Sequence, residues 1–280
     1  MKINEERPHL DEVREFYAEI SYEYDGRREA YLINLYQLFA RCLREIFQER
    51  RFGGPFDTVL DAGCGTGSQV LYAANFCRLI IGIDLVPEAI EVAGKKVEAL
   101  RLRNVRLLVG DVTRLSLRDR TCDCVLSLGD VIGHIPNYEA MLAEVARVAK
   151  PGALFCFECA NKWYPGLLWN REERRAALKD RRKGHLRVWE FQGKALTLNS
   201  FARGEIRTLL ARHGFTILDI YGFDFFTYLL PIPEKYQFSD RPGWREKTVL
   251  ALGKVDLALT RRFPVNRFGY SEVIFARKVS

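Results

Sequence analysis

The stretch 58–67, which reads TVLDAGCGTG, decides how this chain folds. It begins as an apolar run that ends in Asp61, and it continues into three glycines, Gly63, Gly65 and Gly67. The apolar run indicates a buried strand, and the apolar segment after the glycines is typical of a helix. A strand, a glycine turn and a helix in this order form a nucleotide cradle, because glycine tolerates positive φ and lets a ligand approach the main chain.

A second acid follows at the expected distance. The next apolar run, 79–83, ends in Asp84. An acid about 20 residues after the glycine turn, at the tip of the second strand, can accept hydrogen bonds from ribose hydroxyls. Two consecutive strand tips therefore carry features suited to one ligand.

The charge at the turn favours an adenosine ligand other than a dinucleotide. A pyrophosphate on the turn would be repelled by Asp61, which stands just before it. The spacing G-x-G-x-G also lacks the later glycine of the dinucleotide motif. A carboxylate at this place suits a ligand that carries an ammonium group.

On these residues the chain resembles the class I S-adenosylmethionine-dependent methyltransferases, whose glycine motif LDAGCGTG matches 60–67 residue for residue. The resemblance implies a methyltransferase that uses S-adenosyl-L-methionine and releases S-adenosyl-L-homocysteine. It assigns Asp61 to the methionyl ammonium, Asp84 to the ribose and Asp111 to the adenine amino group, although Asp111 could instead cap its loop. The expected cofactor-binding residues are Tyr24, Asp61, Ala62, Gly63, Cys64, Gly65, Asp84, Leu85, Gly110, Asp111, Val112, Leu128 and Gly129.

The rest of the pattern predicts an α/β fold, in which strands and helices alternate around a mostly parallel sheet. The resembling family has a Rossmann-like seven-stranded sheet with helices on both faces and an antiparallel last strand. Strands are expected at 57–62, 79–84, 105–110, 123–128, 153–159, 215–221 and 271–278. Helices are expected at 68–76, 87–101, 137–149, 201–213 and 247–261, with a long amphipathic helix that ends near Phe47.

We expect a single methyltransferase domain over 1–280. Its parts are an N-terminal helical cap (1–54), a cofactor-binding core (55–159), a lid insertion (160–199), further core (200–222), a second insertion (223–269) and the last strand (270–280). The cap and the two insertions are expected at the carboxyl edge of the sheet, where open α/β folds bind ligands. Together they could roof the pocket and select the acceptor.

The candidate catalytic residues follow the fourth strand, in LSLGDVIGHIP at 126–136. This run lacks the Asn- or Asp-Pro-Pro-aromatic motif of methyltransferases that modify base amino groups. It is closer to the turn and His-x-Pro of glycine and sarcosine N-methyltransferases, with Asp130 where they have Asn. His134 is the first candidate for a general base, with Asp130 and Glu158 as alternatives. A purely structural His134 at the turn is an equally good interpretation.

The distribution of charged side chains is compatible with more than one class of methyl acceptor. Residues 171–187 hold eight basic and three acidic side chains, which accounts for most of the formal net charge of +7. Flanking aromatics such as Trp169 and Trp189 suit a lid over an anionic or aromatic small molecule, while the same mixture can grip RNA. We expect a small-molecule acceptor with transfer to O or N; the alternatives are an RNA-modifying enzyme and a non-catalytic S-adenosylmethionine-binding protein.

The N-terminal sequence and the cysteine content indicate the cellular compartment of the protein. The N-terminus has no secretory pattern, and no run is long and apolar enough for a membrane span. Seven cysteines, an odd number in mostly apolar runs, favour a reducing compartment, so a cytoplasmic location is expected. Cys156 and Cys159 resemble half a metal site, but side chains at i and i+3 of a strand point to opposite faces, so no metal is expected.

Overall fold

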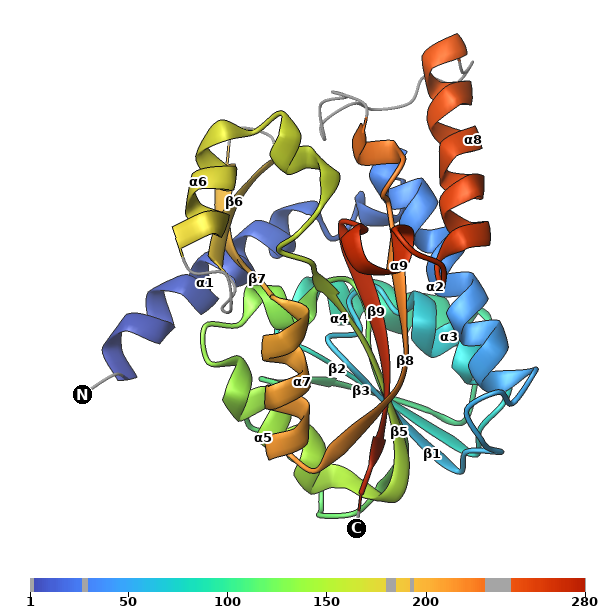
Figure 1. The fold of residues 1–280 in the computed structure, drawn as a ribbon. Helices are drawn as coiled ribbons and strands as arrows, with labels where there is room; N and C mark the ends of the chain where they lie inside the picture. Colours follow the sequence, from blue (N-terminus) through green and yellow to red (C-terminus); the bar gives the residue numbers. More distant parts are fainter. Residues whose placement is uncertain (1–2, 27–29, 180–184, 192–193, 230–242, 280) are drawn as a thin grey trace.

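The computed structural model describes residues 3–26, 30–179, 185–191, 194–229 and 243–279. Its centre is a seven-stranded sheet in the order β3-β2-β1-β4-β5-β9-β8, in which β9 alone is antiparallel to its neighbours (Figure 1). The strands are β1 (Thr58–Ala62), β2 (Leu79–Asp84), β3 (Val105–Val109), β4 (Cys122–Ser127), β5 (Ala149–Ala160), β8 (Phe215–Phe223) and β9 (Ser271–Lys278). This confirms the predicted fold class.

Helices cover both faces of the sheet. One apolar core packs the sheet against α5 and α7, and a second packs the other face against α2 and α3, with α4 at its border. These helices are α2 (Ala30–Phe47), α3 (Ser68–Ala73), α4 (Pro87–Ala99), α5 (Tyr138–Val148) and α7 (Arg203–Arg212). Cys156 belongs to one core and Cys159 to the other, so these two thiols lie on opposite faces of the sheet.

Several predicted boundaries were wrong for local reasons. Helix α3 ends at Ala73, three residues early, because the Asn75 side chain binds the carbonyls of Leu71 and Tyr72 and competes with the helical backbone. A helix was expected at 137–149 and a strand only from 153, with the segment 150–152 between them. Instead it belongs to β5, which begins at Ala149 and reaches its main register through an irregularity.

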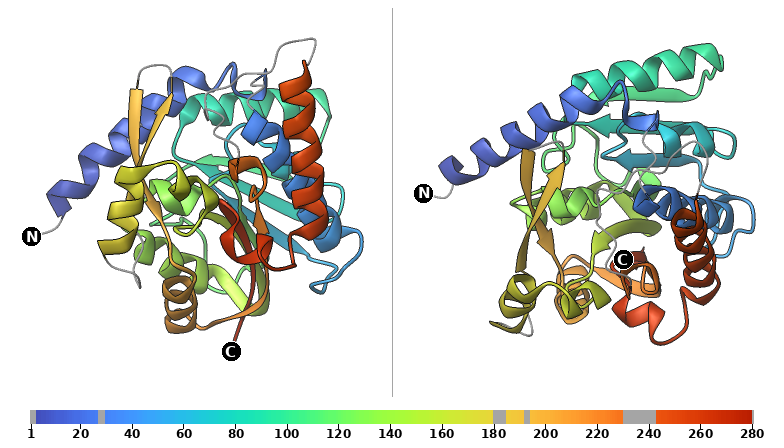
Figure 2. Two further views of the ribbon diagram at one scale, coloured as in Figure 1. Left: turned by 45° about the horizontal axis from the view of Figure 1, so that its top comes forward. Right: turned by 90° about the horizontal axis from the view of Figure 1, so that it is seen from above.

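The N-terminal cap has two helices that were not predicted. Helix α1 (Ile3–Ile20) and the short helix η1 (Tyr24–Gly26) precede α2. Helix α1 runs beside α4 and past a two-stranded hairpin of β6 (His185–Phe191) and β7 (Lys194–Ser200), as both views of Figure 2 show. Val13, Phe16 and Ile20 of α1 pack on Leu196 and Leu198 of β7. The hairpin lies in the first insertion and was not predicted.

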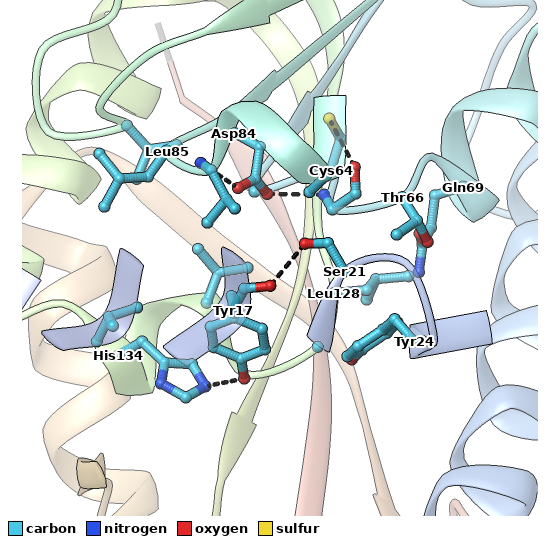
Figure 3. Close-up of a pocket in the computed structure, with 18 of the residues that line it drawn as sticks. Tyr17, Ser21, Tyr24, Cys64, Thr66, Gln69, Asp84, Leu85, Leu128 and His134 are labelled. Atoms are coloured by element: carbon cyan, nitrogen blue, oxygen red, sulfur yellow. Dashed lines mark hydrogen bonds between the residues drawn. The ribbon is translucent and has the colours of Figure 1, made fainter. Parts of the chain in front are cut away.

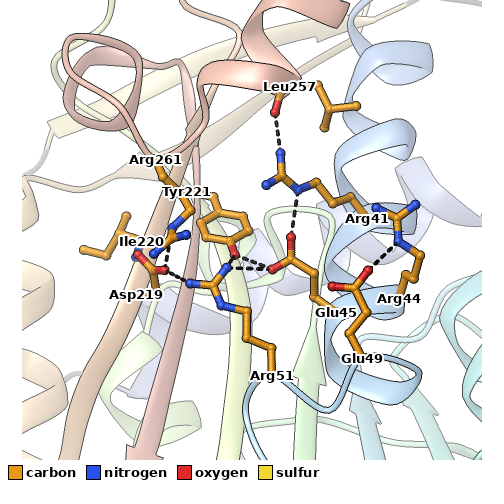
Figure 4. Close-up of polar contacts among 10 residues, drawn as sticks. All are labelled: Arg41, Arg44, Glu45, Glu49, Arg51, Asp219, Ile220, Tyr221, Leu257 and Arg261. Carbon is orange, nitrogen blue, oxygen red and sulfur yellow. Dashed lines mark hydrogen bonds and ion pairs between the residues drawn. The ribbon is translucent and has the colours of Figure 1, made fainter.

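A polar network attaches the cap to the edge strand β8 of the sheet (Figure 4). Arg51 binds Asp219 at 2.6 Å and also contacts Glu45 and Tyr221, so it joins the end of α2 to β8. Arg41 bonds to Glu45 and to the Leu257 carbonyl of α8 (Trp244–Leu259). Burial and the neighbouring Glu45 carboxylate raise the pKa of Tyr221. The network holds α2 and α8 in place.

The remaining short elements connect these parts. They are η2 (Val131–His134), η3 (Pro165–Leu168), α6 (Arg171–Lys179), η4 (Thr227–Leu229) and α9 (Val265–Phe268). Within the described part of the chain, no helix combines the length and the apolar character that crossing a membrane requires. The basic run 171–187 falls only partly inside the described residues, on α6 and the start of β6.

Candidate functional site

A pocket opens at the carboxyl ends of β1, β2, β3 and β4, where an open α/β sheet binds ligands (Figure 3). Its free space is about 1070 Å³ when the open mouth is included. Of the predicted site residues, it is lined by Tyr24, Gly63, Cys64, Gly65, Asp84, Leu85, Gly110, Asp111, Val112, Leu128, Gly129 and His134. The sheet therefore brings together side chains from four separate strand tips.

The glycine turn is shaped by its own backbone. Gly63 has φ of 81°, and a Cβ there would lie 2.5 Å from a methyl carbon of Val131. Gly65 (φ 50°) and Gly129 (φ 97°) also line the pocket, but a Cβ on either would meet nothing within 4 Å. Gly63 thus permits close packing of two strand tips, whereas Gly65 and Gly129 leave open space for a ligand.

Asp61 lies beneath this turn and not on the pocket wall. Its side chain is 1% exposed, and its Oδ2 has no hydrogen-bond partner among the described residues. Burial, and secondarily the nearby Asp84, raise the pKa of Asp61 to about 8. A buried carboxyl oxygen without a partner, next to a pocket, suits an ammonium group, so the donor expected from the sequence fits here. Ala62 is likewise buried, and its carbonyl accepts from Ser127.

Asp84 and Asp111 hold their own loops while they line the pocket. Asp84 accepts from Gly65 N at 2.7 Å and from Val86 N at 3.0 Å, and burial raises its pKa. Asp111 Oδ1 accepts from the backbone N and the hydroxyl of Thr113, as a loop-capping carboxylate does. A carboxylate has about four acceptor sites, and these contacts use two of them in each residue, so both residues can still accept from a ligand.

The opposite end of the pocket joins α1 to η2. Tyr17 Oη lies 2.9 Å from His134 Nε2, and the two rings meet edge to face (Figure 3). The Asn199 side chain of β7 donates to the carbonyls of Gly133 and Ile135, which fixes η2 from outside the pocket. The position of His134 is thus set by two distant segments.

Asp130 and Glu158, the alternative bases, are not among the residues that line the pocket. The Glu158 carboxylate accepts from Ser271 Oγ and from the backbone N of Asp130. Burial raises the pKa of Glu158 to about 7. Asp130 has a φ of 54° and accepts from Ala160 N. Their contacts hold the turn after β4 in place.

The sequence placed the N-terminal cap over the pocket, but it did not predict helix α1. Helix α1, the turn after it and η1 supply this part of the roof, with Leu10, Val13, Tyr17, Ser21 and Tyr24. None of the described residues of the two later insertions lines the pocket, and parts of both insertions lie outside the described residues, so their place in the roof stays a prediction. The hairpin instead packs against α1, and its described residues do not line the pocket. The aromatic residues at 16–24 were a usable signal, because apolar rings on a charged helix need a surface to cover.

Comparisons with known proteins agree with this geometry. Residues 60–157 match the family described as methyltransferase domain. Demethylmenaquinone methyltransferases of Bacillus cereus (strain AH187) and Bacillus anthracis (strain CDC 684 / NRRL 3495) are each 28% identical over 152 residues, covering 53% of this chain and 62% of theirs. The matched part therefore spans less than two thirds of those relatives.

Solved structures share the fold at low identity. An S-adenosylmethionine-dependent methyltransferase from Methanosarcina mazei has a TM-score of 0.55 at 19% identity, covering 82% of this chain and 96% of that one. A chain from the complex of a Haloferax volcanii methyltransferase with the Trm112 methyltransferase activator has a TM-score of 0.59 at 14% identity, covering 94% and 98%. The sequence match identifies a methyltransferase domain over residues 60–157, and the solved structures show that the chain has the Rossmann-like fold of class I S-adenosylmethionine-dependent methyltransferases.

Proposed function

We propose that the protein transfers a methyl group from S-adenosylmethionine to an oxygen or nitrogen of a small-molecule acceptor. The observation that carries this proposal is one pocket with two chemically distinct ends. The glycine turn and its buried acids stand at one end, and the Tyr17–His134 pair stands at the other under a roof of α1.

The residues of the first end would hold the donor. Asp61 would accept from the ammonium, Asp84 from the ribose and Asp111 from the adenine amino group. The open space at Gly65 and Gly129 supports a ligand held close to the main chain. When bound, S-adenosylmethionine supplies an electrophilic methyl group on a positively charged sulfur.

The second end would align the acceptor and exclude water, which are the main tasks in an in-line displacement. Hydroxyl and ammonium acceptors must also lose a proton. His134 is the pocket residue suited to take it, and Tyr17 orients the ring through its contact with Nε2. Apolar roof residues such as Leu10 and Val13 favour an acceptor with apolar or ring-bearing parts. The curated relatives named for demethylmenaquinone agree with a small-molecule acceptor.

The test begins with calorimetry, in which S-adenosylmethionine should bind the wild-type protein. Turnover is then measured over a panel of phenols, alcohols and amines, and on RNA. With the best acceptor, His134→Gln should lower kcat by about 10²-fold or more, because glutamine cannot take a proton. His213→Gln is the matched control, since His213 lies at the end of α7 outside the pocket.

Each outcome has a definite meaning. A loss of less than about tenfold in His134→Gln would exclude a general-base role. Binding without turnover on any acceptor would favour a non-catalytic binding protein. Turnover on RNA alone would favour the RNA-modifying alternative. A protein that fails to bind S-adenosylmethionine would overturn the proposal as a whole.

A further inference from the structure

The segment 10–26 lines the pocket at both of its ends, and we call it the wall 10–26. At the acceptor end, Tyr17 of α1 contacts His134. At the other end, Tyr24 of η1 lines the pocket with the glycine turn, and the next residue is Asp25. One continuous piece of chain therefore spans the distance between the two proposed ligands.

Asp25 attaches this segment to the glycine turn itself. Its Oδ1 accepts from Thr66 Oγ1 at 2.8 Å, and its Oδ2 pairs with Lys96 Nζ of α4. Lys96 Nζ in turn donates to the backbone oxygen of Thr66 at 2.8 Å. The three residues thus contact one another pairwise and form a triangle, in which Thr66 is the residue between the last two glycines of the turn.

The burial within the triangle is uneven. Thr66 is 5% exposed, while the side chains of Asp25 and Lys96 keep 43% and 27% of their surface in solvent. Ion pairs this exposed add little to global stability. The consequence of the triangle is therefore geometric, since it sets where η1 and Tyr24 stand relative to the turn.

We infer that Asp25 is a positioning residue that locks the wall 10–26 onto the glycine turn and so links donor binding to closure over the acceptor site. The inference rests on the proposed function, because it takes the turn to hold the donor. A ligand on the turn favours the locked arrangement, since Tyr24 lines the same pocket. The lock in turn keeps Tyr17 beside His134.

A neighbouring contact provides a matched control. Tyr22 Oη donates to Glu91 Oε2, and Glu91 also pairs with Lys95, one residue before Lys96 on the same helix. These contacts fasten the segment to α4 without touching the glycine turn. A merely structural attachment would depend on both lysines, whereas the proposed lock depends on Lys96.

The first measurement is the affinity for S-adenosylhomocysteine by calorimetry. Asp25→Asn and Lys96→Met should each raise its Kd about tenfold, as expected for the loss of a charge-assisted contact. Lys95→Met should leave the Kd within about twofold. The double variant Asp25→Asn/Lys96→Met should be no weaker than the worse single variant, because the two residues act through one contact.

The second measurement is hydrogen exchange of residues 13–26 with and without S-adenosylhomocysteine. The ligand should slow exchange in the wild type and in Lys95→Met, and it should lose this effect in Asp25→Asn. Melting temperatures of all variants should stay close to the wild type. Unchanged affinity and unchanged protection in Asp25→Asn would overturn the inference and leave the proposed function standing. A wild-type protein that does not bind S-adenosylhomocysteine would overturn the proposed function itself.

Discussion

The two ends of the pocket are built in different ways. The donor end comes mainly from three successive strand tips, within residues 61–112 of the chain. The acceptor end joins Tyr17 to His134, which are 117 residues apart. The first is a property of a local motif repeated along a parallel sheet, and the second exists only once α1 has docked. The difference predicts that substitutions at one end, outside the Asp25 contacts that link the two ends, should leave the function of the other largely intact.

The largest effect should come from Gly63→Ala. The new Cβ would overlap Val131 at a backbone angle that favours glycine. We expect the Kd for S-adenosylhomocysteine to rise at least about 100-fold, as strain and overlap both act on the turn. Gly152→Ala is the control, because Gly152 has almost the same φ of 80° but meets nothing within 4 Å. Equal Kd values in the two variants would show that close packing at the turn does not matter for binding.

Next in size is the pH dependence of donor binding. With a pKa of about 8, the Asp61 carboxyl of the free protein holds its proton at neutral pH. A bound ammonium favours the carboxylate, so binding releases that proton. Between pH 6 and pH 7, affinity should therefore rise about tenfold. Calorimetry at several pH values tests this, and Asp61→Asn should abolish the dependence. A flat wild-type profile would remove Asp61 from the donor end.

The smallest effect should come from Tyr17→Phe at the acceptor end. It removes one hydrogen bond to His134 and keeps the edge-to-face ring contact. We expect kcat to fall about threefold to tenfold, with the Kd for S-adenosylhomocysteine unchanged. Tyr22→Phe, at an exposed ring outside the pocket, is the control. A change in the Kd without a change in kcat would contradict the division between the two ends.

Much of the fold could be predicted because its signals are local. Apolar runs that end in acids gave β1 and β2 at nearly their observed bounds, and the later strands followed from the same alternation. The errors occurred where side chains or strand pairing override local preference. Asn75 ended α3 early, and pairing with Cys122 drew Ala149 into β5. The division of the chain into cap, core and insertions stays a prediction.

The candidate site divides in the same way. The glycine turn and the acids at 61, 84 and 111 could be read from the sequence, because each acid lies at or just after the end of its strand and parallel strands end at one edge. Only the tertiary structure decided which part of the cap forms the roof, that Glu158 supports a turn and that Asp25 reaches Thr66. Those contacts join segments that are distant in sequence. The segments meet only when the helices pack on the sheet, and the apolar burial that drives this packing is non-directional, so no local pattern specifies the partners. The sequence thus determined the donor end, and the docking of α1 determined the acceptor end.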